Sequence, residues 1–447
     1  MGIWVYILLA IVLSRIALGK KNIAFEHYIW MLLPIDMYGV TMFDFTLKPY
    51  MLFSALLFFR MCYCRRIHKL YIGSSWRKYG LILCILALVT NLLNGAAVSS
   101  VMAILMTLVV YSCCLVYTTN IRGSYAQIIE VITATSVGYG LVFITVYLLF
   151  WLGVDIPGAV TAERMEPGMI MQFGSMSGDV YIRSYRLRGF LIDPNSLIGM
   201  FAPAIAASVV KMSKDILRIR DVLALLVTLG CVFLSNSRMG VVCAVISVAL
   251  GIFLSLRIMP QRKKGNFIFM LVVFAVMCSV ALIVTETGKQ MITRIYYDVF
   301  GYRSGLSGKY GRIALWKEAL QILTENNALL GVGQGQIRNF SSTELDGHNT
   351  WIEWICGSGI IVGGAIVLYF WMAVCWAWKV RNIYPQKSDV QSIYYVLLVG
   401  FTCVMISLLT VDNITYSYLW FLWITLQNIV DKRDKQIYAQ GRCYNDS

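Results

Sequence analysis

The residues of this chain that could do chemistry gather in four short polar segments. The first runs from Arg188 to Gly199, with Asp193, Pro194 and Asn195 between them. Asp193 can cap a helix whose first turn holds Pro194, but a cap leaves the nearby arginine unexplained. A helix N-terminus beside an arginine is a ready site for an anion. The segment therefore predicts an anion site at Arg188.

The second segment is a tight turn, Ser235 to Gly240, that joins two apolar stretches. One interpretation is a polar cap whose Arg238 reaches up to the lipid headgroups. Basic residues concentrate on the cytoplasmic side of membrane proteins, however, and the loop charges described below place this turn on the opposite side. Arg238 is therefore a second candidate for anion binding.

The third segment predicts an amphipathic helix that begins at Arg312, with Trp316 and Leu320 on its apolar face. The dipole of a helix disfavours a cation in its first turn, and a bound anion would remove that conflict. Lys309 lies just before the helix and is a further candidate cation. The glycines at 331–335 lack the spacing of a dinucleotide-binding motif and predict a turn.

The fourth segment opens with His348 and Asn349 and continues into a glycine-rich apolar stretch. A histidine at this position could simply cap a membrane helix. The chain has three histidines, however, and the other two are less suited to chemistry outside the membrane. His27 lies in a weakly apolar stretch and His68 in a basic loop on the other face. His348 is therefore the candidate for proton transfer outside the membrane.

Composition indicates what positions these segments. Of the 447 residues, 59% are hydrophobic and 14% are charged, and the mean hydropathy is +0.70. A soluble domain carries about 25% charged residues, so the composition argues against a soluble enzyme and against disorder. A membrane span needs about 20 apolar residues, and the chain supplies them repeatedly. Most of the twelve cysteines lie in apolar stretches, where they act as small hydrophobic residues rather than as a disulfide framework.

We predict an all-α polytopic membrane protein with about 12 or 13 transmembrane helices and two long external loops that contain short helices. The count depends on residues 23–40, whose Glu26, His27, Pro34 and Asp36 indicate a broken or interfacial helix. The apolar stretches lie at about 3–18, 23–40, 49–63, 79–93, 98–118, 125–152, 194–210, 221–236, 239–256, 267–285, 349–378, 393–410 and 413–430.

The charges of the loops predict the orientation. Alternate loops hold most of the 38 basic residues, so that face is expected to be cytoplasmic. The net charge of +15 is then a topology signal, and no nucleic-acid partner is expected. The chain divides into N-terminal transmembrane helices at 1–152, an external loop at 153–193, helices at 194–285, a large external catalytic loop at 286–348, C-terminal helices at 349–430 and a cytoplasmic tail at 431–447.

The four segments, in this order, resemble the superfamily of O-antigen ligases and Wzy-type O-antigen and capsular polysaccharide polymerases. The resemblance covers about residues 183–365. It lies in the Asp-Pro-Asn segment at Arg188–Gly199, the Ser-Arg turn at Ser237-Arg238, the Gly-Arg…Trp helix at Gly311–Trp316, the glycine turn at Gly331–Gly335 and the His-Asn start of the span at His348–Gly363.

The resemblance implies a glycosyltransferase of the bacterial cytoplasmic (inner) membrane whose active site faces outward. Its donor would be a glycan on an undecaprenyl-pyrophosphate carrier. A polymerase passes this glycan to a sugar hydroxyl of another lipid-linked repeat, whereas a ligase passes it to lipid A-core. We favour the polymerase and keep the ligase as the alternative.

The resemblance also implies roles for individual residues. His348, Arg312 and Arg188 would be catalytic, with the histidine activating the acceptor hydroxyl or relaying its proton. The pyrophosphate and glycan would be bound by Arg188, Arg312, Arg238, Lys309, Asn195 and Asn349. The chemistry agrees, because a leaving pyrophosphate gains charge at the transition state and needs fixed cations or a metal. Direct displacement would invert the anomeric carbon, and no cofactor is expected.

Two other classes of protein would also bind lipid-linked glycans. A transporter or flippase would be expected to bury charges within its spans, often with internal repeats, whereas the arginines and histidine here gather at the outer face. A non-catalytic membrane assembly protein is the other alternative. As partners we expect the lipid-linked oligosaccharide, the bilayer, a flippase and a chain-length regulator.

We predict that glycan transfer by this protein does not need a metal ion. The chain contains no Asp-x-Asp motif, so arginine forks would do the work that a bound metal does in other transferases. Transfer between purified lipid-linked repeats should therefore survive chelation. The measurement is product length with and without EDTA. Loss of activity on chelation, restored by magnesium or manganese, would contradict the arginine argument.

Overall fold

The computed structural model describes most of the chain. The residues described are 2–42, 45–64, 75–121, 125–161, 166–177, 180–214, 218–269, 272, 289, 293, 312–342, 347–382, 389–411 and 413–445. Lys309 and most of the predicted span 267–285 lie outside these residues.

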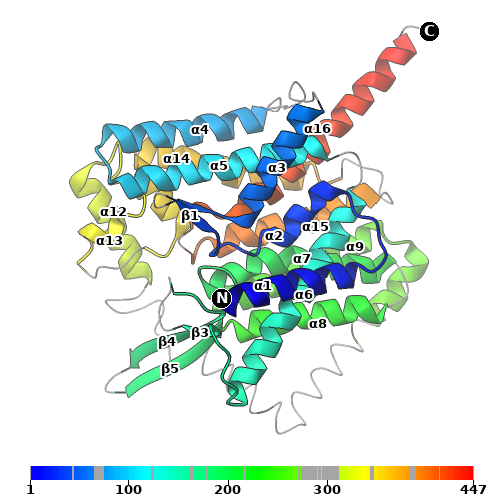
Figure 1. Ribbon diagram of the computed structural model, residues 1–447. Coiled ribbons are helices and arrows are strands. Elements are labelled where there is room, and N and C mark those ends of the chain that lie inside the picture. The colour runs from blue at the N-terminus through cyan, green and yellow to red at the C-terminus, as the bar shows by residue number, and fades with distance from the viewer. Residues whose placement is uncertain are drawn as a thin grey trace.

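Helices account for most of the described residues (Figure 1). Those of the N-terminal half are α1 (Gly2–Leu18), α2 (Ile29–Leu32), α3 (Pro49–Tyr63), α4 (Ser75–Leu93), α5 (Val98–Asn120) and α6 (Ala126–Trp151). Those of the C-terminal half are α7 (Leu197–Lys214), α8 (Ile219–Leu234), α9 (Arg238–Ile258), α12 (Arg312–Asn326), α13 (Ile337–Phe340), α14 (Thr350–Lys379), α15 (Asp389–Ser407) and α16 (Ser417–Asn445). Seven of the described helices are long and apolar enough to cross a membrane, which confirms an all-α polytopic membrane protein.

The weak second stretch is a broken helix, as its sequence predicts. A 3-10 turn at Phe25–Tyr28 leads into the four-residue helix α2, and the helix ends just before Pro34. Proline ends a helix because it lacks an N–H group and its ring clashes with the preceding turn. Asp36 follows and is buried, and Lys48 Nζ lies 2.6 Å from its carboxylate.

The first long external segment differs from the prediction. Short helices are expected there, but the segment forms three strands: β3 (Val160–Thr161), β4 (Ile170–Ser177) and β5 (Val180–Leu187). β4 and β5 pair antiparallel, with Ile170 opposite Leu187, and β3 lies parallel to β4. The reason lies in the residue types, since β5 is rich in valine, isoleucine and tyrosine, which favour strands. A second hairpin joins β1 (Val40–Met42) to β2 (Phe45–Leu47).

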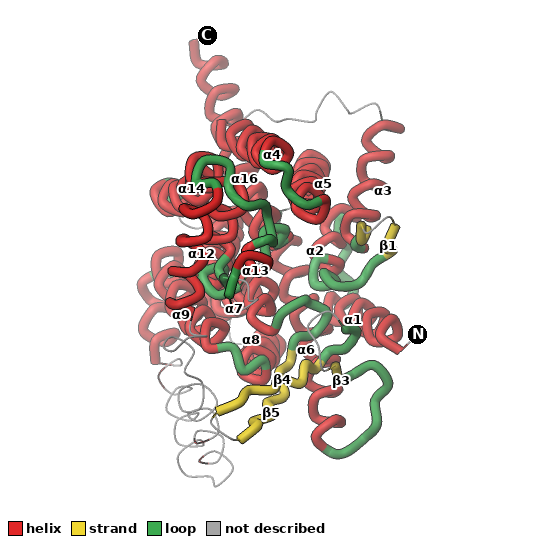
Figure 2. The backbone as a smooth tube through the Cα atoms, turned by 90° about the vertical axis from the view of Figure 1, so that its left-hand side faces the viewer, coloured by secondary structure: helices red, strands yellow, loops and turns green. Residues whose placement is uncertain are grey.

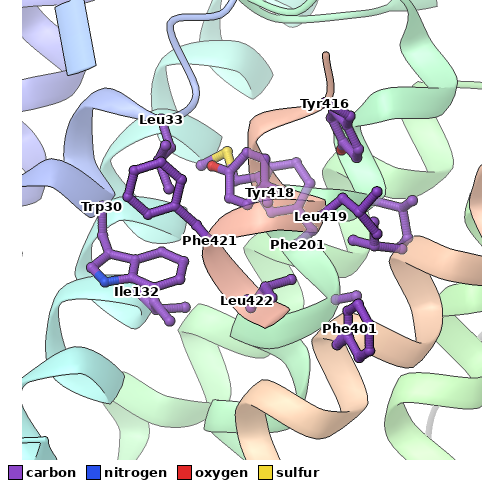
Figure 3. Close-up of a cluster of buried hydrophobic side chains, with 14 of the residues drawn as sticks. Trp30, Leu33, Ile132, Phe201, Phe401, Tyr416, Tyr418, Leu419, Phe421 and Leu422 are labelled. Atoms are coloured by element: carbon purple, nitrogen blue, oxygen red, sulfur yellow. The ribbon is translucent and has the colours of Figure 1, made fainter. Parts of the chain in front are cut away.

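The core lies around α7, α15 and the first half of α16. These helices are buried along most of their length, and Figure 2 shows α7 inside a layer of outer helices. Figure 3 shows aromatic side chains of α16 packed against α2, α6, α7 and α15. The ring centroids of Trp30 and Phe421 are 6.1 Å apart, and the Phe401 and Trp423 rings stack at 5.3 Å. Helices in a membrane associate through such close packing.

The elements expected outside gather at one end of the helices. In Figure 1 the β4–β5 hairpin, α12 and α13 lie on the left, whereas the C-terminus of α16 projects at the upper right. α12 packs against α14, and α13 contacts both. The polar segments named above are thus carried on one end of the bundle.

One membrane helix is interrupted where it meets this end. α14 is broken at Gly359. The φ of this residue is 81°, a backbone conformation that residues with a side chain rarely adopt. Backbone N–H and C=O groups without a hydrogen-bond partner are costly inside a membrane. The glycine turn at 331–335 supplies partners for backbone carbonyls near the break. The N–H groups of Val332 and Gly333 donate to the carbonyls of Cys356 and Gly357, at 2.8 and 3.1 Å. The predicted turn is confirmed, with positive φ at Gly331, Gly333 and Gly335.

The orientation can be tested with single cysteines. Asp155 and Ser342 are exposed and belong to the two segments expected outside. Asp155→Cys and Ser342→Cys should react with an impermeant thiol reagent in intact cells. The wild-type chain is the control, because its exposed Cys64 lies on the face expected inside. If both variants were labelled only after lysis, the orientation would be the opposite of the predicted one, and the site would not face outward.

The break in α14 yields a stability prediction. A Cβ at Gly359 would lie 1.9 Å from the Leu329 carbonyl oxygen, at a φ that is strained for alanine. Gly359→Ala should therefore lower the free energy of unfolding by about 3 kcal/mol. Gly364→Ala is the matched control, since a Cβ there meets no atom within 4 Å. The measurement is the thermal unfolding of the purified protein, and equal midpoints for the two variants would contradict the geometry.

Candidate functional site

Arg188 is buried, with 0% of its surface exposed, just before the chain enters α7. Its Nε donates to the Gly168 carbonyl at 3.1 Å, and its Nη2 donates to the carbonyls of Gly168 and Glu166. Burial lowers the pKa of Arg188, while the neighbouring Tyr38 and Asp193 raise it. These described donors face backbone carbonyls of the chain. The geometry is that of an arginine which holds the loop in shape.

A second arginine ties the first polar segment to the Ser-Arg turn. Arg186 is buried, and its Nε donates to the Ser235 carbonyl at 3.0 Å. Its Nη2 donates at 3.0 Å to the Asn195 side-chain oxygen. Asn195 in turn donates its backbone N–H to the Asp193 carboxylate at 2.6 Å. Arg186 therefore fixes both segments, and its role could not be assigned from the sequence.

Arg238 begins α9 directly after this turn. The Ser237 hydroxyl caps the helix by accepting the Gly240 N–H at 2.9 Å. Asn236, just before the cap, has a φ of 48° and donates its amide to the Tyr185 carbonyl at 3.2 Å. The turn is thus held against β5, and Arg238 lies half-buried at its edge.

Arg312 joins this group from the other long segment. It begins α12 and is half-buried. Burial lowers the pKa of Arg312; the Asp193 carboxylate raises it, and the positive charge of Arg238 lowers it. Charges act in this way over short distances, so Arg312, Arg238 and Asp193 lie near one another. Three of the four polar segments therefore meet, although more than 100 residues separate Asp193 from Arg312.

A hydrogen bond ties α12 to His348. Trp316 lies one turn beyond Arg312 on the same face of the helix, and its indole N–H donates to the Gly347 carbonyl at 2.9 Å. His348 follows that carbonyl and is half-buried. Asn349 then caps α14, accepting the N–H groups of Trp351 and Ile352 at 3.0 and 3.3 Å. The side chain of Asn349 thus has a structural role as well as its predicted binding role.

The backbone of the site carries strain at two positions. Asn236 and His348 are the residues other than glycine with positive φ in the part of the chain that the structure describes, at 48° and 45°. Such residues gather at functional sites, where the surrounding structure holds them in place. One stands two residues before Arg238, and the other is the predicted proton acceptor.

The arrangement suits an anion rather than a metal. Four arginines, Arg186, Arg188, Arg238 and Arg312, gather near two carboxylates, Asp193 and Glu166, which leaves an excess of positive charge. No group of three or more His, Cys, Asp or Glu side chains that could hold a metal ion occurs among the described residues. A half-buried site of fixed arginines binds phosphate groups through paired donors.

The structure brings together most of the residues predicted from the sequence. Asp193 acts on Arg188 and Arg312 and accepts the Asn195 N–H, Arg238 acts on Arg312, and His348 and Asn349 join them through Trp316 and α12. Lys309 lies outside the described residues. Arg186 and Tyr416 are additions: the Tyr416 hydroxyl donates to the Ser196 carbonyl, beside the Asp-Pro-Asn turn. The spacing of Arg186 in the sequence could have pointed to it. Arg186 stands two residues before Arg188, and residues at this spacing in a strand point to the same side.

Comparison with known proteins finds a match for part of this site. Residues 223–367 match the family model described as O-antigen ligase. No protein of curated function matches the chain. The match begins in α8 and ends in α14, so it includes Arg238, Arg312 and His348. The chain is therefore a multi-pass membrane protein whose residues 223–367 are similar to the family described as O-antigen ligase.

Proposed function

We propose that this protein polymerises polysaccharide repeat units on the outer face of the cytoplasmic membrane. It would move a glycan from an undecaprenyl-pyrophosphate carrier to a sugar hydroxyl of a second lipid-linked repeat. The family match supports O-antigen ligase or polymerase chemistry in general, and the donor, the acceptor and the stereochemistry are our proposal.

The meeting of Arg238 and Arg312 beside Asp193 carries the proposal. Both cations are held by helix N-termini, where the dipole adds further positive potential. Burial and the charge of Arg238 both disfavour the charged form of Arg312, and a bound pyrophosphate would stabilise it. The pyrophosphate gains charge as the glycosidic bond breaks, so fixed cations there stabilise the transition state more than the ground state.

His348 would accept the proton of the acceptor hydroxyl. The hydroxyl oxygen forms a bond to the anomeric carbon as the bond from that carbon to the pyrophosphate oxygen breaks. The leaving pyrophosphate keeps the electron pair and is held by the arginines, and the anomeric carbon is inverted. The Trp316 bond to Gly347 supports this assignment, because it fixes the histidine relative to the helix that begins at Arg312.

Arg188 has a different part in the proposal from the one that the sequence implies. Its donors meet the carbonyls of Gly168 and Glu166, so we place it behind the site as a positioning residue. It would hold the Asp-Pro-Asn loop, and with it Asp193, at the correct distance from Arg312.

An O-antigen ligase that transfers to lipid A-core is the second candidate, and the description of the matching family favours it. The two activities share the donor and differ in the acceptor. Offering the purified protein lipid-linked repeats and lipid A-core separately therefore separates them, because a polymerase extends the first acceptor and a ligase glycosylates the second.

The proposed roles predict that substitutions of the arginines and of the histidine will change the transfer rate and the donor affinity in different ways. Arg312→Ala and Arg238→Ala should lower kcat/KM for transfer by about 10²–10³-fold, as the loss of one charge-stabilising donor does. Arg312→Lys keeps the charge but loses the paired donors, so it should also lose activity. His348→Ala should keep donor affinity and lose turnover by about 10²–10⁴-fold.

The assay is transfer between purified lipid-linked repeats, with donor binding measured separately. Lys317→Ala is the matched control, because Lys317 is an exposed cation on the same helix and should leave the rate unchanged. Arg188→Ala should lower thermal stability as well as activity. Wild-type turnover by His348→Ala would remove the proton-transfer role, and wild-type turnover by both arginine variants would remove the pyrophosphate site.

A further inference from the structure

A groove lies on the side of the bundle where α1, α6 and α8 come together. α6 packs against both α1 and α8 and forms the floor between them. The groove encloses about 260 Å³ and has one wall of α1 residues, Leu13, Ile16 and Ala17. Ile16 is 66% exposed, and an exposed apolar residue on a helix of this apolar bundle faces lipid. The groove therefore opens toward the bilayer.

The floor of the groove is apolar along most of its length. It is formed by Thr133, Ala134, Val137 and Leu141 of α6. From Glu130, where the floor begins, to Leu141 is eleven residues, or about 16 Å of helix. The hydrocarbon core of a bilayer is about 30 Å thick. The groove thus spans about one leaflet, which is the depth of one acyl chain.

Cations gather at one end of the groove. Lys21 Nζ lies 3.0 Å from the Glu130 carboxylate, Lys211 Nζ lies 3.1 Å from it and Arg220 Nη2 lies 3.2 Å from it. Arg220 also lies 4.0 Å from the buried Asp221. Three cations thus meet two carboxylates. The side chains of Lys21 and Arg220 are 43% and 41% exposed, so both can contact a group outside the protein.

One further carboxylate lies nearby. Asp389 lines an adjoining cavity of about 210 Å³ together with Glu130 and Lys211. The same Asp389 also lines a cavity with Lys263. Four cations, Lys21, Lys211, Lys263 and Arg220, thus lie around three carboxylates, Glu130, Asp221 and Asp389, which leaves an excess of one positive charge, and the exposed cations at the mouth of the groove are Lys21 and Arg220.

We propose that this groove binds an anionic glycerophospholipid of the cytoplasmic leaflet. One acyl chain lies over Ala134 and Val137, and the phosphate lies between Lys21 and Arg220. Basic pockets between membrane helices on the cytoplasmic side recognise anionic headgroups, and each buried methylene adds to the binding. The cations stand at the end of α1 and the start of α8, on the face that the loop charges predict to be cytoplasmic.

A polyprenyl carrier is a poorer occupant of the same groove. Its pyrophosphate would enter the proposed catalytic site from the outer face, whereas the cations of the groove stand at the opposite end of α6. The two sites are therefore separate, and the lipid would contribute to the stability of the α1–α6–α8 unit rather than to the reaction.

The test is lipid binding to the purified full-length protein, followed by native mass spectrometry and by the shift in unfolding temperature. The probes are phosphatidylglycerol, phosphatidylcholine and a polyprenyl phosphate. Phosphatidylglycerol should bind and raise the unfolding temperature, and phosphatidylcholine should bind far more weakly. Lys21→Gln with Arg220→Gln should weaken phosphatidylglycerol binding by about fivefold for each cation removed.

The matched control is Arg262→Gln with Lys264→Gln, which removes two charges on the same face away from the groove and should leave binding unchanged. Val137→Phe keeps every charge and fills the floor, so it tests the groove even where the double variant does not fold. Equal binding of phosphatidylcholine, unchanged phosphatidylglycerol binding by Val137→Phe, or preference for the polyprenyl phosphate would each overturn the assignment.

Discussion

The candidate site depends on how several arginines are kept close together without an equal number of carboxylates. Like charges repel most where water is scarce, and Arg188 and Arg186 are both buried. The chain meets this cost by turning backbone carbonyls toward them: those of Gly168 and Glu166 toward Arg188, and that of Ser235 toward Arg186. Asp193 supplies the negative charge that acts on both Arg188 and Arg312.

This arrangement explains why the site needs elements that lie outside the bundle. Arg186 belongs to β5, whose pairing with β4 carries it to the Ser235 carbonyl. Arg312 belongs to α12, which is held on α14 by the Trp316 bond and by packing of Ala319 and Leu323 against Cys356. Val332 of the glycine turn, which pairs with the break in α14, packs against the same cluster. A membrane helix, a surface helix and a turn are thus fastened together at one end of the protein.

Much of the fold follows from the sequence, because hydropathy determines which stretches lie in a membrane. The predicted stretches 79–93, 98–118 and 239–256 correspond closely to α4, α5 and α9. The first external segment was not predictable in the same way, since β4 and β5 are stabilised by pairing with each other and hydropathy carries no information on that pairing. Among the candidate site residues, the arginines of the four polar segments were predicted from the sequence. Arg186 was not, because its significance comes from contacts with Asn195 and Ser235 that only the folded chain makes.

The two ends of the protein carry different basic residues, and the difference affects how the charge of the candidate site responds to pH. The loops expected in the cytoplasm mix lysine with arginine, since topology requires only charge. The described cations of the candidate site are all arginines. Burial lowers the pKa of Arg312, yet a guanidinium starts so high that it stays charged, and it offers paired donors that a lysine lacks. The positive field at the proposed pyrophosphate site is therefore constant over the physiological pH range.

Any pH dependence of transfer near neutrality must then come from a group that titrates there, and a histidine is that group in the proposed mechanism. Because a general base acts in its neutral form, the rate should rise from mildly acidic to mildly alkaline pH, with the arginines unchanged.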